Sequence, residues 1–167
     1  MPNTGRRSSA LRAVLMRIQS VFVKRHPSTV APDKPLKAIE RRRSPIAGWG
    51  VFALEPITKN SRIVDYKGEK ISWKESDKRE ERYAARGCIW CFVLTKKTVR
   101  DAKVGGNIAR FINHKCKPNC YTQVIGDVIW IRAGRNIRKG EELSYDYETG
   151  GGAQIQCKCR PNCKTLL

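Results

Sequence analysis

Five cysteines in the last third of the chain constrain the fold more than any other feature: Cys116, Cys120, Cys157, Cys159 and Cys163. Two segments are near copies, Cys-Lys-Pro-Asn-Cys at 116–120 and Cys-Arg-Pro-Asn-Cys at 159–163. Thiolates in such short turns suit a closed tetrahedral zinc site. Neighbouring Lys and Arg side chains lower the thiol pKa and so favour the ligand form. The chain has seven cysteines, an odd number that fits a disulfide framework poorly.

The spacing alone leaves the four zinc ligands open. One possible ligand set consists of the four cysteines of the two near copies. The other takes Cys157, Cys159 and Cys163 with one upstream partner, and reduced structural thiols or disulfides are the remaining alternative. Cys88 and Cys91 are three residues apart on a predicted strand, so they should face opposite sides of it. We therefore expect these two to pack rather than to bind metal.

Size and charge bound the function. A chain of 167 residues fits one domain with a small appendage. Its 34 Lys and Arg against 15 Asp and Glu give a net charge of +19, which favours a polyanionic partner such as nucleic acid, or an anionic membrane surface. A hydrophobic content of 40% excludes wholesale disorder. No apolar run approaches the ~18 residues of a membrane span, so no membrane span is expected.

The N-terminal segment differs from the rest of the chain. The first 32 residues contain six basic side chains and no acid. Apolar residues between positions 11 and 22 have helical spacing, a pattern that organellar transit peptides share. The simpler prediction is a solvated, disordered basic tail over residues 1–35.

The remainder predicts a mostly β fold with short helices. Residues 62–66, 88–94, 121–125 and 128–133 favour strands, and Gly126-Asp127 predicts a hairpin turn between the last two. The run 145–147 resembles a core strand. Ser72 and Glu75 have capping-box spacing before a charged helix at 73–85 that Gly87 can end.

A second dense segment ends in Asn113 and His114, just before the first cysteine-proline turn. A lone histidine is more often a hydrogen-bonded structural residue than a base. The sequence shows no serine or cysteine nucleophile arrangement around it. The residues alone therefore indicate a small, basic, zinc-stabilised β domain.

Six motifs, in order, resemble those of SET-domain protein lysine methyltransferases with a cysteine-rich post-SET tail. They are Gly48-Trp-Gly-Val-Phe-Ala53, Tyr66-Lys-Gly-Glu69, Thr98-Val-Arg-Asp-Ala102, the run from Gly106 to His114, Pro118-Asn119 and Glu142-Leu-Ser-Tyr-Asp-Tyr147. The resemblance covers about residues 38–163. It implies a SET-domain fold at 36–149, with several small β-sheets and a pseudoknot-like C-terminal segment, and a post-SET zinc-binding tail at 150–167.

The resemblance also implies roles for individual residues. Tyr147 matches the tyrosine credited with catalysis, Tyr66 lines the lysine channel, and Tyr145 influences how many methyl groups are added. A tyrosine at position 145 implies a preference for monomethylation. The cofactor, S-adenosylmethionine, would be bound by Gly48, Trp49, Gly50, Trp90, Arg110, Asn113 and His114.

For zinc, the resemblance selects Cys116, Cys157, Cys159 and Cys163. Two positions depart from the family pattern. Three residues separate Cys159 from Cys163 where the family usually has four, which leaves Cys120 as a substitute ligand. Trp90 stands where the family commonly has a tyrosine that touches cofactor and substrate.

The resulting hypothesis is an S-adenosylmethionine-dependent protein-lysine N-methyltransferase acting on histones or a histone-like DNA-binding protein. Non-specific DNA contact through the basic surface is a second expected interaction, and the oligomeric state is left open. The implied location is the nucleus or chromosome in a eukaryote, and the cytoplasm or a host cell for a bacterial protein. The alternatives are a catalytically weak SET-like module and a zinc-dependent nucleic-acid-binding protein.

Overall fold

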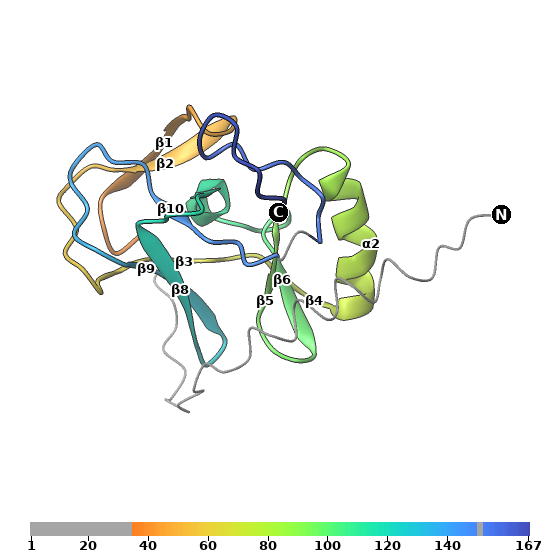
Figure 1. Ribbon diagram of the computed structural model, residues 1–167. Coiled ribbons are helices and arrows are strands. Elements are labelled where there is room, and N and C mark those ends of the chain that lie inside the picture. Colours follow the sequence, from red (N-terminus) through yellow and green to blue (C-terminus); the bar gives the residue numbers. More distant parts are fainter. Residues whose placement is uncertain (1–34, 150–151) are drawn as a thin grey trace.

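The computed structural model describes residues 35–149 and 152–167 (Figure 1). Strands dominate these residues, so the predicted mostly β class with short helices is confirmed. The helical pattern at 11–22 lies outside the described residues, and the domain boundaries at 35/36 and 149/150 stay predictions. No described helix combines the length and apolar character needed to cross a membrane.

The described elements, in chain order, are β1 (Ile39–Arg43), β2 (Trp49–Ala53), β3 (Arg62–Asp65), β4 (Glu69–Ser72), α2 (Trp73–Ala84), β5 (Cys91–Val93), β6 (Thr98–Asp101), the 3-10 helix η2 (Ile108–Phe111), β7 (Asn113–His114), β8 (Cys120–Ile125), β9 (Val128–Ala133) and β10 (Ser144–Tyr145). The strands form four small sheets. β1 and β2 make an antiparallel pair, and two three-stranded antiparallel sheets have the orders β3-β9-β8 and β4-β6-β5. The fourth sheet is a parallel pair of β7 and β10.

The predicted hairpin between β8 and β9 is confirmed. The two strands pair without interruption from Cys120 opposite Ala133 to Ile125 opposite Val128. Gly126 has a φ of +59°, a conformation that glycine adopts without steric cost. A glycine with positive φ at the first position of a two-residue loop lets the strands keep their right-handed twist.

The predicted helix is also confirmed, as α2. The Ser72 hydroxyl accepts a hydrogen bond from the Glu75 amide at 3.3 Å, which caps the helix start. The helix ends at Ala84, one residue earlier than expected, and Gly87 follows with a φ of +68°.

Arg79 attaches α2 to the neighbouring sheet. Its guanidinium contacts Glu75, one turn earlier in the helix, at 2.8 Å, Glu69 of β4 at 2.6 Å and Asp101 of β6 at 2.8 Å. The Asp101 carboxylate is fully buried, and it also accepts a hydrogen bond from the Tyr83 hydroxyl at 2.9 Å. Arg79 therefore joins α2 to β4 and β6 through one fully buried carboxylate and two partly exposed ones.

Two predicted strands are shorter in the structure. β5 begins only at Cys91, so Cys88 precedes it, and the prediction that Cys88 and Cys91 face opposite sides of one strand is wrong. β10 ends at Tyr145, so Tyr147 lies beyond the strand.

The hydrophobic core lies between β2, β3 and β9, whose buried side chains are Val51, Ala53, Ile63, Val64, Ile129, Ile131 and Ala133. Tyr66, just after β3, and Tyr145 of β10 belong to the same cluster. The core therefore continues into the segment that contains the predicted site tyrosines.

Candidate functional site

The parallel pairing of β7 with β10 brings two distant segments together. Asn113 lies opposite Ser144, and His114 lies opposite Tyr145. His114, Ser144 and Tyr145 are buried, so this pairing is part of the interior.

Further hydrogen bonds fix the chain beyond both strands. The Lys115 amide donates to the Tyr145 carbonyl at 3.3 Å, and the Tyr147 amide donates to His114 Nδ1 at 3.2 Å. The Tyr147 hydroxyl donates to the Ile112 carbonyl at 2.8 Å. The segment around Tyr147 is thus held across the segment 112–115, the arrangement that the resemblance describes as a pseudoknot.

The Asn113 side chain links β7 to the turn before β2. Its amide nitrogen Nδ2 lies 3.0 Å from the Trp49 carbonyl, 3.1 Å from Ser44 Oγ and 2.8 Å from Glu142 Oε1. Glu142 Oε1 also accepts a hydrogen bond from Ser44 Oγ at 2.7 Å. One side chain therefore fixes the position of the backbone at Trp49.

The two glycines of this turn are required for different reasons. Gly48 has a φ of +47°, a conformation that residues with a Cβ rarely adopt. Gly50 is required for space, because a Cβ there would lie 2.3 Å from Glu142 Oε1. Glycine at both positions lets the turn lie directly against the Glu142 side chain.

Four aromatic rings form a continuous row, and the last of them, Tyr147, contacts the His114 ring. The ring centres of Tyr66 and Phe92 lie 5.6 Å apart, those of Phe92 and Tyr145 6.4 Å, and those of Tyr145 and Tyr147 4.9 Å. The structure thus brings together all three tyrosines that the sequence predicted for the site.

The three hydroxyls have different partners. Tyr66 donates to the Trp90 carbonyl at 3.0 Å and Tyr147 to the Ile112 carbonyl at 2.8 Å. The described part of the chain offers the Tyr145 hydroxyl no hydrogen-bond partner. Burial raises the pKa of all three tyrosines above the usual value, so the hydroxyls are neutral at physiological pH.

Trp90 contributes to the row through its backbone. Its carbonyl accepts hydrogen bonds from the Tyr66 hydroxyl and, at 3.0 Å, from the Ala102 amide. Its ring meets Tyr83 edge-on at 4.9 Å, and the Lys103 ammonium lies 4.6 Å from the ring centre. The indole is therefore held between Tyr83 and Lys103.

His114 has the geometry of a structural histidine. Its Nδ1 accepts the Tyr147 amide, so that nitrogen carries no proton, and Nε2 lies 3.5 Å from Cys116 Sγ. Burial lowers the pKa of His114, and the nearby Asp146 carboxylate opposes this more weakly. The ring is therefore neutral near pH 7.

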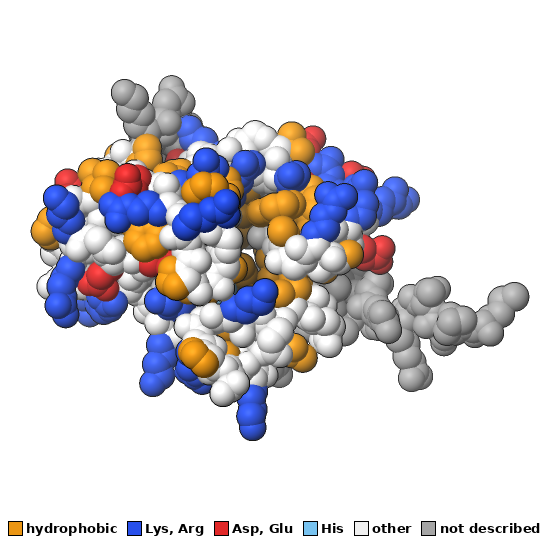
Figure 2. Space-filling view, turned by 90° about the horizontal axis from the view of Figure 1, so that it is seen from above, with side chains coloured by type: hydrophobic (Ala, Val, Ile, Leu, Met, Phe, Trp, Pro, Cys, Tyr) orange, Lys and Arg blue, Asp and Glu red, His pale blue; other side chains and the backbone are white. Residues whose placement is uncertain are grey.

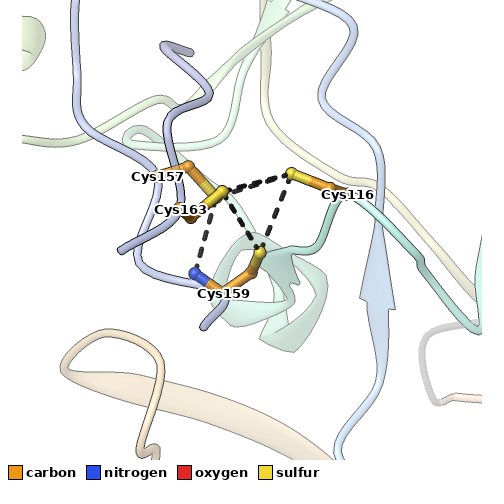
Figure 3. Close-up of side chains that lie close together, drawn as sticks. All are labelled: Cys116, Cys157, Cys159 and Cys163. Carbon is orange, nitrogen blue, oxygen red and sulfur yellow. Dashed lines mark hydrogen bonds between the residues drawn. The ribbon is translucent and has the colours of Figure 1, made fainter. Parts of the chain in front are cut away.

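Four cysteine thiols converge beside His114 (Figure 3). The sulfurs of Cys116, Cys157, Cys159 and Cys163 all lie within 4.8 Å of one another. Cys116 Sγ lies 3.9, 3.7 and 3.7 Å from the sulfurs of Cys157, Cys159 and Cys163. A tetrahedral metal with ~2.3 Å bonds to sulfur requires sulfur separations of ~3.8 Å. The donor set and its spacing therefore fit a zinc ion.

Cys120 does not take part in this group. It is 2% exposed at the start of β8, where its thiol lies 3.4 Å from Asn119 Oδ1 and burial raises its pKa to about 12. By contrast, hydrogen bonds from Thr165 lower the pKa of Cys163 to about 6. The two near copies therefore contribute unequally, one through its first cysteine and the other through both.

A hollow of about 790 Å³ separates the C-terminal segment from the turn before β2. Pro45, Ile46 and Lys115 line one side, and residues 156–163 line the other. Ligand sites of ~300–1,000 Å³ are typical for cofactors and small molecules. It adjoins the cysteine group, and its lining includes none of the predicted cofactor residues.

Arg110 lies apart from this pocket. Its guanidinium sits 4.7 Å from the ring centre of Phe111 and donates to the Ala102 carbonyl at 3.4 Å. It borders a second hollow of about 330 Å³, together with Arg41 and Asn107. Asn113 thus contacts the glycine turn directly, whereas Arg110 is connected to Trp49 through Phe111 and Arg41.

Asn119, Glu142 and Ser44 were not among the predicted site residues. Asn119 is 4% exposed, donates to the Glu142 carbonyl at 2.9 Å and accepts the Ser144 amide at 2.8 Å. Asn119 and Glu142 belong to two of the six motifs that carry the resemblance, so the sequence could have indicated them as site residues. Ser44 carried no such signal.

The curated relatives of this chain are histone-lysine N-methyltransferases. The set1 protein of Dictyostelium discoideum is 42% identical over 139 residues, which cover 78% of this chain and 9% of that protein. An H3 lysine-4 specific enzyme of Eremothecium gossypii is 41% identical over 145 residues, covering 80% and 15%. ASHH1 of Arabidopsis thaliana is 42% identical over 120 residues, covering 67% and 24%. The chain thus spans less than a quarter of the length of each of these relatives.

Solved structures agree in fold. Chaetomium thermophilum Polycomb Repressive Complex 2 bound to GSK126 matches with a TM-score of 0.62 and 31% identity, over 66% of this chain and 16% of that chain. A humanized mutant of that complex matches with a TM-score of 0.59 and 33% identity, over 66% and 15%. The sequence model of the SET domain family matches residues 48–148, which is more than half of the chain. The chain belongs to the SET-domain family.

Proposed function

We propose that the chain is a protein-lysine N-methyltransferase that uses S-adenosylmethionine. The observation that carries this proposal is the row of Tyr66, Phe92, Tyr145 and Tyr147, which ends at His114, the residue after the Asn113 that fixes the turn. A buried aromatic row provides the apolar channel that methyl transfer to a neutral lysine side chain requires.

S-adenosylmethionine supplies a methyl group bound to a positively charged sulfur. Gly48, Trp49 and Gly50 would hold it through backbone groups, and Asn113 keeps the Trp49 carbonyl in place. His114, hydrogen-bonded to Tyr147, borders the same region. Contacts of Trp90 and Arg110 with the cofactor stay predictions.

The substrate amine must be neutral to attack, although lysine has an ordinary pKa of ~10.4. Burial in an apolar channel favours the neutral amine. The raised pKa values of Tyr66, Tyr145 and Tyr147 keep their hydroxyls uncharged, so these side chains add no negative charge that would stabilise the ammonium form. Alignment of the amine then supplies the remaining rate enhancement, without a general base.

The hydroxyls divide this work. Tyr66 and Tyr147 donate their protons to backbone carbonyls, so their oxygens are left as acceptors for the amine N–H groups. The Tyr145 hydroxyl is free to hold the amine or a water molecule and to crowd an added methyl group. We therefore propose a preference for monomethylation.

We propose zinc as the metal held by Cys116, Cys157, Cys159 and Cys163. The sulfur separations fit tetrahedral zinc, and a cysteine-only set favours this metal over hard cations such as Mg²⁺. The ion would link the C-terminal segment to the chain just after Asn113 and His114, closing the lysine channel.

The proposed substrate is a histone. The names of the relatives support this class, and that of the Eremothecium gossypii enzyme specifies H3 lysine 4. We also propose contact with nucleic acid, because a net charge of +19 repels a free basic peptide and attracts one already bound to DNA.

The experiment is methyl transfer from labelled S-adenosylmethionine to histones by the purified chain, with and without DNA. We expect label in a histone band and one methyl group per modified lysine by mass spectrometry. No label in any histone, free or DNA-bound, while the chain still binds S-adenosylmethionine in calorimetry, would contradict the proposed activity.

A further inference from the structure

The His114 ring lies between the cysteine group and Tyr147. Its Nδ1 accepts a hydrogen bond from the Tyr147 amide at 3.2 Å, and its Nε2 lies 3.5 Å from Cys116 Sγ. The ring also meets the Tyr147 ring edge-on, with the two centres 5.5 Å apart. One side chain therefore contacts both a proposed metal ligand and the tyrosine proposed for catalysis.

The hydrogen bond at Nδ1 decides where the ring carries its proton. Nδ1 accepts the Tyr147 N–H, so the ring has its proton on Nε2. Asp146 Oδ1 also lies 3.5 Å from Nδ1, but it already accepts the Glu148 amide at 2.9 Å. The Nε2–H group is thus left to donate to Cys116 Sγ, and a distance of 3.5 Å suits the large sulfur atom.

The sulfur of Cys116 is suited to accept this hydrogen bond. A cysteine that binds a metal does so as a thiolate, which accepts hydrogen bonds and cannot donate one. Positive surroundings favour the thiolate, and Figure 2 shows the face with the C-terminal segment, where Lys and Arg side chains outnumber Asp and Glu. An Nε2–H group that faces a thiolate makes a charge-assisted hydrogen bond, which is stronger than one between neutral groups.

Thr165 makes a second contact with the same sulfur. Its hydroxyl oxygen lies 3.3 Å from Cys116 Sγ, so this hydroxyl can also donate to a thiolate. Among the described residues, no hydrogen bond connects the Thr165 side chain to Tyr147. Thr165 thus supports the cysteine group alone, whereas His114 connects that group to Tyr147.

Burial makes the contacts of His114 hard to replace. The residue is 6% exposed, so water does not readily take the place of the ring at the Tyr147 amide. The Tyr147 hydroxyl donates to the Ile112 carbonyl, two residues before His114. The amide and the hydroxyl of Tyr147 are therefore both held by the segment 112–114, and Cys116 follows this segment directly after Lys115.

We infer that His114 is a positioning residue that connects the cysteine group to the tyrosine assigned to catalysis. Its Nε2–H group holds the Cys116 thiolate as a ligand, while its Nδ1 holds the Tyr147 backbone in place for methyl transfer. Hydrogen-bond partners of metal ligands typically change metal affinity or activity by ~10–100-fold. This inference rests on the proposed zinc site and the proposed methyl transfer, and it gives the ring a role separate from the predicted contact of His114 with the cofactor.

Two substitutions separate the two hydrogen bonds of the ring. His114→Asn keeps an acceptor near the place of Nδ1 and loses the donor to Cys116. His114→Gln places an amide nitrogen near Nε2 and loses the acceptor for the Tyr147 amide. Thr165→Val is the matched control, because it removes a donor to the same sulfur without changing a contact of Tyr147.

The test measures zinc affinity by competition with a chromophoric chelator, and kcat with zinc, S-adenosylmethionine and histone all saturating. Zinc affinity should fall ~10-fold or more in His114→Asn and in Thr165→Val, and should stay near the wild-type value in His114→Gln. The kcat should fall ~10-fold or more in His114→Gln and keep the wild-type value in Thr165→Val. Saturation with the cofactor keeps any change in its affinity out of kcat.

Each half of the inference has its own contradicting result. Wild-type zinc affinity in His114→Asn would overturn the hydrogen bond to Cys116. A wild-type kcat in His114→Gln would overturn the positioning of Tyr147. Absence of methyl transfer by the wild type would contradict the proposed function instead, and the zinc affinities would still test the bond between His114 and Cys116.

Nitrogen-15 NMR of the unmodified, zinc-loaded chain tests the position of the proton without depending on how the variants fold. The chain has two histidines, His26 and His114, so His26→Gln assigns the signals. We expect a proton on Nε2 of His114 that exchanges slowly with water. A proton on Nδ1 would leave Cys116 without this donor and would overturn the proposal.

Discussion

Gly50 and Glu142 approach so closely that a methyl group on Gly50 would lie 2.3 Å from the Glu142 carboxylate oxygen. The same oxygen accepts hydrogen bonds from Asn113 and Ser44. The absence of a side chain at Gly50 thus allows one carboxylate to join the turn before β2 to β7.

Gly50→Ala should destabilise the fold and displace the glycine turn before β2. The added methyl group forces the Glu142 carboxylate away from Asn113 and Ser44, and overpacking of this kind costs about 1–3 kcal/mol. Urea denaturation measures the loss. Gly134→Ala is the matched control, because its nearest neighbour, the Asn119 carbonyl, lies at 3.4 Å. Equal unfolding free energies for the two variants would refute the predicted role of this contact.

The elements with local signals could be predicted from the sequence. Glycine with an Asp beside it marks a two-residue hairpin, and Ser72 with Glu75 marks a helix start, because short-range geometry decides both. The contacts of Arg79 with Glu69 and Asp101 could not be predicted, since these two partners lie on β4 and β6 rather than on the helix of Arg79.

Removal of one thiol from the cysteine group should remove the metal. Cys163→Ser should lose the proposed single zinc ion per chain and loosen the C-terminal segment, because the remaining three sulfurs cannot complete a closed site. Cys120→Ser, in the near copy, should keep the metal. Elemental analysis by mass spectrometry measures the content, and loss of zinc from Cys120→Ser with retention in Cys163→Ser would reverse the ligand assignment.

The spacing of the cysteines does not identify which four of them form the group. The two near copies suggest a symmetric set, but Cys120 begins β8 and its side chain enters the core. Which thiol points inward depends on the pairing of β8 with β9, which the cysteine pattern does not contain. The resemblance to the family, rather than the spacing, indicated Cys116.

Tyr145→Phe should change the number of methyl groups added. Loss of the free hydroxyl removes the group that would hold the amine or a water molecule and makes room for a second and third methyl. Mass spectrometry of the modified histone should show di- and trimethyl lysine where the wild type gives monomethyl. An unchanged product distribution would contradict the proposed monomethyl preference.

Glu80 should make stability depend on pH. Burial, followed by repulsion from Asp77, raises its pKa to about 7, Asp101 adds to this, and hydrogen bonds with Ser76 and Cys91 oppose it. The folded state therefore binds more protons than the unfolded state between about pH 4.5 and 7. The stabilisation of the folded state by protonated Glu80 is therefore fully present below pH 4.5 and is lost as pH rises through 7.

The check compares unfolding free energies at pH 5 and pH 8. Glu80→Gln should remove on the order of 2 kcal/mol of the difference between the two pH values. Glu81→Gln, at an exposed neighbouring position, should keep the wild-type difference. Parallel pH profiles for the wild type and Glu80→Gln would show that Glu80 does not control this dependence.

The most direct test of the proposed function removes one hydroxyl from the aromatic row. Tyr147→Phe keeps the ring contacts with Tyr145 and His114 but loses the hydrogen bond to the Ile112 carbonyl. Tyr121→Phe, on the exposed face of β8, is the matched control. Methyl transfer to histones should fall roughly 10²-fold or more in Tyr147→Phe, with S-adenosylmethionine binding retained, and stay at the wild-type rate in Tyr121→Phe. A wild-type rate in Tyr147→Phe would contradict the assignment of this tyrosine to catalysis.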